Sequence, residues 1–156
     1  MDWDAIGAMV EITGAVVVLV TLVYLSIQIR NNTAMTKASI RQSRVDWSLE
    51  WASAFSNSEY LPAIYIKLQN AEELTPEEES RWIPFLHAWH RNLESALLQQ
   101  TDGLLDGEVL EGQRRNLVDD ASGKTILYKW ENHRTRFDPR YQTFVDAAIS
   151  EGLQKG

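Results

Sequence analysis

The longest apolar stretch of the chain runs from Ala5 to Ile29, and Glu11 is its one charged residue. As an α-helix, the uncharged part from Ile12 to Ile29 is about 27 Å long at roughly 1.5 Å per residue. With the apolar residues before it, this length suits a hydrocarbon core of about 30 Å. The pattern therefore predicts a single transmembrane helix. The alternative is a helix buried in a soluble core, which is also apolar on all sides.

The charged residues that flank this run predict its orientation. Asp2 and Asp4 precede it. The charged residues that follow it, up to residue 44, are all basic: Arg30, Lys37, Arg41 and Arg44. By the positive-inside rule, the N-terminus lies outside the cell and the rest of the chain lies in the cytoplasm. We expect the run to be retained, because a cleaved signal peptide has a basic start and a small-residue cleavage site.

Small and polar residues within the run share one face of the predicted helix. Alternating steps of four and three residues connect Gly7, Glu11, Gly14, Val18, Thr21, Leu25 and Gln28. In a membrane, small residues let two helix backbones approach, and polar side chains form hydrogen bonds between them. We therefore expect a transmembrane association face made of Gly7, Glu11, Gly14, Thr21 and Gln28. The alternative is a chance arrangement in which Glu11 is an interfacial acid.

The apolar pattern continues after the run without a helix breaker. No Pro or Gly occurs between Gly14 and Pro62, so the helix is expected to extend into the cytoplasm. Two apolar stripes follow, one of Ile40, Trp47, Trp51 and Ala54 and one of Val45, Leu49 and Ala52. A helix with two apolar sides should be covered by neighbours on both. We divide the chain into a tip with a transmembrane helix, residues 1–30, and a cytoplasmic all-α domain, residues 31–156.

Helix start and stop signals divide the rest of the chain. Thr75 and Glu78 form a capping box around Pro76, which opens a helix that ends at Asp102-Gly103. The apolar residues of this helix recur at helical spacing and should face the core: Trp82, Leu86, Trp89, Leu93 and Leu97. Further starts are predicted at Pro62, at Asp106 and at Asp138-Pro139. No segment alternates as a strand does, so the expected fold is all-α with four or five helices after the span.

Composition narrows the classes of function. The net charge of −7 argues against a nucleic-acid partner, because phosphate contacts need a basic surface. The basic residues after the run are better explained by topology and by anionic lipid. The chain has no cysteine, which excludes disulfides and thiolate metal sites. Its 6 tryptophans are typical of a small domain that contacts partner proteins or a membrane surface.

Only one group of residues suggests site chemistry in the helical part. His87, His90 and Glu94 lie at steps of three and four, which places them on one side of a helix, as in some metal sites. No matching Glu-x-x-His occurs on a second helix, so these are weak metal candidates, and ordinary boundary positions are the preferred interpretation. No nucleophile elbow, dinucleotide loop or P-loop is present. We therefore expect no cofactor, no metal and no enzymatic activity.

Several short stretches match a recurring pattern: Gly7–Ala8, Glu11–Ile12, Gly14–Ala15, Leu22–Leu25, Gln28–Arg30, Asn32–Thr33, Gly103–Asp106, Glu111–Gly112 and Phe144–Asp146. With them the chain resembles a widespread family of small bacterial membrane proteins with one N-terminal span and a C-terminal helical domain. The resemblance covers nearly the whole chain and implies a location in the bacterial inner membrane. It transfers no activity.

These observations favour a non-enzymatic inner-membrane subunit that self-associates through its span and scaffolds a larger membrane assembly. Its expected partners are membrane lipid, further copies of itself or another membrane protein. A second hypothesis is an oligomeric channel or gating element in which Glu11 side chains surround a pore. A third, a metal-binding or enzymatic helical domain, depends on His87, His90 and Glu94 alone.

Overall fold

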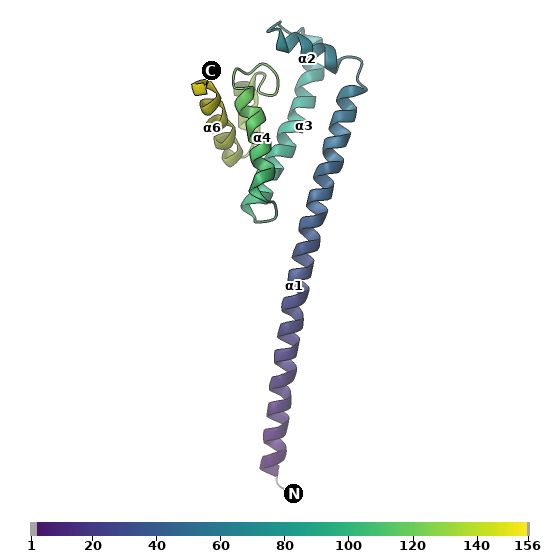
Figure 1. Cartoon of the computed structure of the whole chain (residues 1–156), viewed down its shortest axis with the longest axis vertical. Coiled ribbons are helices and arrows are strands. Elements are labelled where there is room, and N and C mark those ends of the chain that lie inside the picture. Colours follow the sequence, from purple (N-terminus) through teal and green to yellow (C-terminus); the bar gives the residue numbers. More distant parts are fainter. Residues whose placement is uncertain (1–2, 156) are drawn as a thin grey trace. The chain divides into compact units, whose positions relative to one another are not determined.

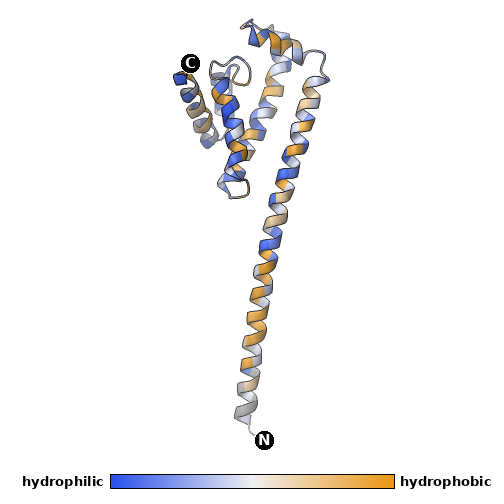
Figure 2. Cartoon of the chain, in the orientation of Figure 1, coloured by the Kyte–Doolittle hydropathy of each residue, from blue (hydrophilic) through white to orange (hydrophobic). Residues whose placement is uncertain are grey.

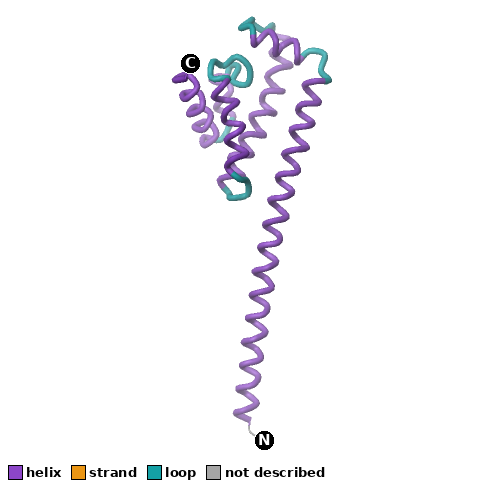
Figure 3. Tube along the Cα trace, in the orientation of Figure 1, coloured by secondary structure: helices purple, strands orange, loops and turns teal. Residues whose placement is uncertain are grey.

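The protein is all-helical over the residues that the structure describes. A computed structural model describes residues 3–155, and near the start of the chain it leaves the side chains of residues 4–6, 8 and 10 undescribed. Six α-helices and one 3-10 turn follow one another, and no strand occurs between residues 3 and 155 (Figure 3). The expected all-α fold is confirmed. Asp2, which supported the predicted orientation, lies outside the described residues.

The first helix, α1, runs without interruption from Trp3 to Ser56 (Figure 1). The expected continuation of the apolar run into a long helix is therefore present, and Asn31 and Asn32 lie within helical backbone. The chain divides into two compact units, one up to Ile40 and one from Arg41 onward. This division lies inside α1, beyond the boundary expected after residue 30.

The first unit exposes its apolar surface. One stretch of α1 in this unit is predominantly orange, the colour of hydrophobic residues, and hydrophilic residues follow it (Figure 2). Between Ile12 and Ile29 the large apolar side chains are from 48% to 65% exposed. By length and composition, α1 is the one helix of the described chain that could cross a membrane.

The second unit adds five further helices to the end of α1. They are α2 (Leu61–Gln69), α3 (Pro76–Thr101), α4 (Gly107–Asp119), α5 (Trp130–His133) and α6 (Pro139–Lys155), with a 3-10 turn at Arg134–Arg136. Residues 120–129 connect α4 to α5 without regular structure. Between Lys124 and Phe137, the helical residues are those of the short α5 and of the 3-10 turn alone.

Two of the four predicted helix starts, those of α3 and α6, have the expected side-chain caps. The Thr75 hydroxyl accepts the Glu78 N–H, and the Glu78 carboxylate accepts the Thr75 N–H, which completes the capping box. The Asp138 carboxylate accepts the backbone N–H of Arg140 at 2.8 Å. Asp106 occupies the N-cap position of α4, but its side chain makes no capping bond.

Two helices end in the same way with different residues. After α3, Gly103 takes φ +72° while its N–H and that of Leu104 bond to carbonyls of the last turn. After α2, Ala71 and Glu72 make the equivalent bonds, with Ala71 at φ 58°. This left-handed conformation suits Gly and costs a residue with a Cβ about 1–2 kcal/mol. The end of α3 was therefore readable from Gly103, whereas Ala71 gives no such signal.

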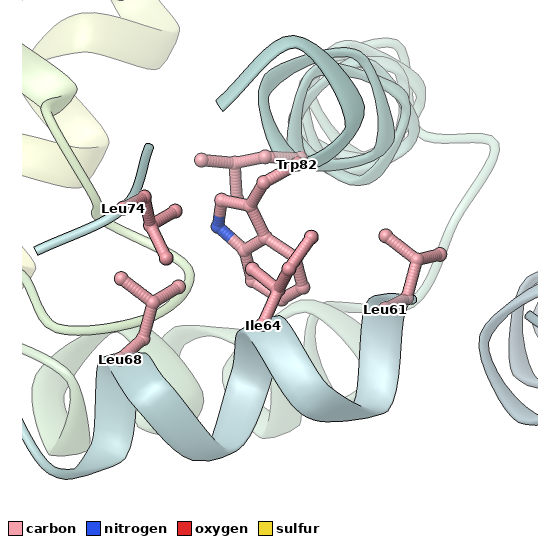
Figure 4. Packing of buried hydrophobic residues seen from close by; sticks show 6 residues of the cluster. Leu61, Ile64, Leu68, Leu74 and Trp82 are labelled. Atoms are coloured by element: carbon pink, nitrogen blue, oxygen red, sulfur yellow. The ribbon is translucent and has the colours of Figure 1, made fainter. Parts of the chain in front are cut away.

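One part of the core forms between α2 and α3. Leu61, Ile64 and Leu68 lie along one side of α2 and point toward Trp82 of α3 (Figure 4). Leu74, from the connection between the two helices, closes the same cluster. Leu61, Ile64 and Leu68 are separated by steps of three and four residues, so they share the buried face of α2. Only 3% of the Trp82 surface is exposed.

A second part of the core forms where α6 packs on α4. Tyr141, Val145 and Ala148 of α6 are fully buried, as is Leu117 of α4. Gly152 lets the helices approach closely, because an added Cβ would lie 2.3 Å from the Val118 carbonyl oxygen and 2.3 Å from the Ala121 Cβ. The predicted core side of α3 is also buried at Trp82, Leu86, Trp89 and Leu93, while Leu97 is half-buried.

The end of α1 is covered on one side only within the second unit. Trp47 and Trp51 are half-buried, and the Trp51 ring stacks on Phe85 of α3 with centroids 4.5 Å apart. Val45 and Leu49, on the second stripe, are 52% and 65% exposed, and Ala52 is exposed as well. The expectation that both stripes are covered is wrong for the second one, because no described element of this unit packs over it.

Candidate functional site

The predicted association face lies entirely on exposed helix in the first unit. Gly7, Glu11, Gly14, Thr21 and Gln28 are all exposed. A Cβ added at Gly7 or Gly14 would meet no atom of the described chain within 4 Å. No contact inside the described chain therefore requires a residue without a side chain at these two positions.

The polar residues of this face differ in their hydrogen bonds. The Thr21 hydroxyl donates to the Val17 carbonyl at 2.8 Å, and the Gln28 amide donates to the Tyr24 hydroxyl at 2.6 Å. These bonds stay within α1, one turn back along the helix. Among the described side chains, none bonds to the Glu11 carboxylate. Unlike Thr21 and Gln28, Glu11 thus has no hydrogen-bond partner among the described side chains.

His90 lies in the core of the second unit, with 2% of its surface exposed. Its Nε2 is 2.8 Å from the Ile126 carbonyl oxygen, and its Nδ1 is 2.7 Å from the Tyr141 hydroxyl. A carbonyl can only accept, so Nε2 carries the proton and Nδ1 accepts from Tyr141. Burial lowers the pKa of His90 to about 4 and raises the pKa of Tyr141 well above its ordinary value.

This arrangement identifies His90 as a core residue and corrects its interpretation as a boundary residue. Its ring stacks on Trp130 with centroids 4.9 Å apart and is tilted against Phe137 at 5.5 Å. Both ring nitrogens are used, one as donor and one as acceptor, which leaves no lone pair for a metal ion. Sequence spacing placed His90 at the border of the core side of α3, and it could not show the partners Ile126 and Tyr141, which lie far along the chain.

Glu94 and His87 have separate partners. One Glu94 oxygen accepts the backbone N–H of Asp138 at 2.6 Å, and the other pairs with Arg91 at 2.7 Å. Glu94 thereby ties α3 to the start of α6. The His87 ring meets His133 edge to face at 4.8 Å, and burial lowers the pKa of both. Within residues 3–155, no three His, Asp or Glu side chains are grouped to hold a metal ion.

An aromatic cavity of about 560 Å³ opens in the second unit. Its walls combine Trp51 and Phe55 of α1 with Tyr65 of α2 and with Trp82 and Phe85 of α3. Each of these rings lies within 6.4 Å of the next, measured between centroids. The sequence showed the tryptophans but not the cavity, because its walls come from three helices.

Asp120, on the polar side of this cavity, is a structural residue. Its carboxylate accepts the Thr125 N–H at 3.0 Å, the Thr125 hydroxyl at 2.9 Å and the Leu127 N–H at 2.8 Å. These bonds fix the connection between α4 and α5, which has no regular structure of its own. The carboxylate is therefore engaged by the chain and is not free for chemistry in the cavity.

The exposed face of α1 and the cavities of the second unit are therefore the surfaces on which a function can be based. Comparisons with protein-family models, with curated proteins and with solved structures found no match for this chain.

Proposed function

We propose that this chain is a non-enzymatic membrane subunit that self-associates through α1 and holds its helical domains together as a scaffold. The observation that carries the proposal is the exposure of every residue from Glu11 to Ile29. Apolar surface of this extent needs cover from lipid or from another helix. Lipid covers the Val, Leu and Ile side chains well, but it does not account for the small residues.

The glycines support contact with a second helix. A Gly in a helix interior costs about 1 kcal/mol relative to Ala. Gly7 and Gly14 carry this cost although the described chain leaves open space at both positions. A second α1 packed against this face would use that space, because small residues let backbones approach closely in a membrane.

Glu11 is the polar residue on which this contact depends most. Thr21 and Gln28 already donate hydrogen bonds within their own helix. A carboxyl group inside a span is costly unless it is paired. The Glu11 carboxyl lies one turn from both Gly7 and Gly14, where the helices would be closest, and it would bond to a polar group of the neighbouring helix.

The proposal also includes a location and an orientation. The basic residues after the span favour a cytoplasmic second unit. The bacterial inner membrane is the location that the family resemblance implies. A tag before Met1 should then be labelled on intact cells, and a tag after Gly156 only after lysis. Labelling of the C-terminal tag on intact cells would reverse the orientation.

The association is tested by measuring oligomer size in a mild non-ionic detergent. The wild-type chain should form a defined oligomer. Gly14→Leu should give monomers, because the side chain separates the two backbones. Glu11→Ala should weaken association by about 0.6–2 kcal/mol through loss of an interhelical hydrogen bond.

The matched control is Val16→Leu, a change of similar chemistry on another face of the helix. It should leave the oligomer size unchanged. If the wild-type chain is monomeric, or if Gly14→Leu keeps the wild-type size, the association face is wrong. Glu11 is then an interfacial acid.

A further inference from the structure

A second concavity of the helical unit, of about 360 Å³, differs from the aromatic cavity in charge. It lies between the Arg41–Ser48 segment of α1, Asn92 of α3, and Val109 and Gln113 of α4. Two arginines line it and no carboxylate does. In a chain with a net charge of −7, this is a local reversal of sign.

Arg44 is the residue that makes this concavity unusual. It is half-buried, and burial lowers the pKa of its guanidinium. Among the described residues, no carboxylate forms an ion pair with it and no acceptor bonds to it. The other half-buried arginines of the described chain each have a carboxylate partner: Arg81 with Glu77, Arg114 with Glu111 and Glu151, and Arg134 with Asp146. A partly desolvated, unpaired charge is unfavourable until an anion pairs with it.

The surrounding residues suit an anion that carries an apolar group. Arg41 adds a second positive charge, and its contact with Asp106 is weak, at 3.8 Å with both side chains more than half exposed. Asn92 and Gln113 supply neutral amides at the wall. Trp47 and Val109 supply apolar surface beside the arginines. The concavity thus combines guanidinium donors with an apolar wall.

We propose that this concavity is a binding site for a small amphiphilic anion, a phosphate monoester or a carboxylate with a short apolar chain. The planar guanidinium of Arg44 pairs with two oxygens of the head group, which is the geometry that Arg offers to phosphate and carboxylate. The apolar chain lies against Trp47 and Val109. The site is independent of the proposed association through α1, which uses other residues.

The test uses the full chain in a non-ionic detergent with hexyl phosphate as the probe, followed by equilibrium dialysis. We expect saturable binding of one molecule per chain, with inorganic phosphate and hexanol each binding at least tenfold more weakly. Arg44→Gln should weaken hexyl phosphate binding at least tenfold, and Arg44→Lys should weaken it less. Arg115→Gln is the matched control, because Arg115 is an exposed arginine of α4 outside the concavity, and it should bind as the wild type does.

Two sources of such a head group are distinguished by repeating the titration in lipid nanodiscs. If lipid phosphate monoesters occupy the site, hexyl phosphate binds the wild type more weakly in discs that contain phosphatidic acid than in phosphatidylcholine discs. If the natural ligand is a free anion, the two affinities are equal. The proposal is overturned if the wild type shows no saturable binding at millimolar hexyl phosphate, or if Arg44→Gln and Arg41→Gln both keep wild-type affinity.

Discussion

The two units of this chain differ in whether contacts within the chain account for their buried polar residues, charged residues and glycines. In the helical unit, the buried His90 has two hydrogen-bond partners, the buried Glu94 has two, and Gly152 is required by the close approach of α4. In the first unit, Gly14 and Glu11 have no such reason within the described chain. The unusual residues of the helical unit are therefore explained by contacts within that unit, whereas no contact of the described chain explains Gly14 or Glu11.

The largest expected effect comes from removing Trp82, which is central to the contact of α2 with α3. Trp82→Ala should lower the free energy of unfolding of the helical unit by about 3–5 kcal/mol, because a large buried side chain leaves a cavity. The measurement is urea unfolding of the full chain in non-ionic detergent, followed by circular dichroism.

The comparison between the units needs a matched change in the first unit. Leu19→Ala removes an apolar side chain that is 62% exposed. It should change the unfolding free energy of the helical unit by less than about 0.5 kcal/mol. A loss of several kcal/mol for Leu19→Ala would mean that the two units do not have separate stabilities.

A smaller effect is expected from pH and depends on His90. Its pKa is about 4 in the folded chain and about 6.5 in the unfolded chain, so below pH 6.5 the unfolded state binds more protons. The contribution is fully present above pH 6.5 and is lost progressively until about pH 4. The total loss is about 3 kcal/mol, from 1.36 kcal/mol for each pKa unit. His87 and His133 have lowered pKa values and act in the same direction.

The check is the unfolding free energy measured in steps between pH 7 and pH 4. The carboxylates with lowered pKa values, such as Glu151 at about 2, begin to lose their contribution only below about pH 4.5, the ordinary pKa of a Glu, so a slope between pH 6.5 and pH 4.5 reports the histidines. His90→Phe should be less stable at pH 7, because the Ile126 carbonyl loses its donor, but it should show a flatter curve between pH 6.5 and pH 4. A wild-type curve without slope in this window would contradict the burial of a neutral His90.

The smallest expected effects come from the same substitution at two glycines. Gly152→Ala should destabilise the helical unit by roughly 1–3 kcal/mol, because the new methyl group meets the Val118 carbonyl oxygen at 2.3 Å. Gly14→Ala meets nothing within 4 Å and should leave that unfolding free energy unchanged. If the proposed association is correct, Gly14→Ala instead reduces oligomer formation. Equal unfolding losses at both sites would remove the contrast between the units.

The parts of the fold that the sequence predicted are those with local causes. The capping box of Thr75 and Glu78, the Gly103 helix end and the cap at Asp138 each act within a few residues. The end of α2 was not predicted, because Ala71 takes a left-handed conformation that is usually adopted by Gly. Helical spacing also identified the buried face of α3, although it could not say how far Leu97 would be covered.

The parts of the candidate sites that the sequence missed have long-range causes. His90 is a core residue because Ile126 and Tyr141 reach its two nitrogens from distant segments. The concavity lined by Arg41 and Arg44 exists because about two turns of α1 face residues of α3 and α4, and no spacing within α1 reveals this. The association face was found from spacing alone, since its residues share one helix, and its role stays a prediction.

The bonds of Asp120 have a consequence for amide hydrogen exchange. Backbone N–H groups in irregular loops usually exchange quickly with solvent deuterium, and slow exchange is commonly attributed to helices and strands. The Thr125 and Leu127 amides lie outside any helix, yet both donate to a half-buried carboxylate. Their exchange should be slow and should become fast together when that carboxylate is replaced. Slow exchange within residues 121–129 would thus result from the Asp120 carboxylate and would not indicate a further helix.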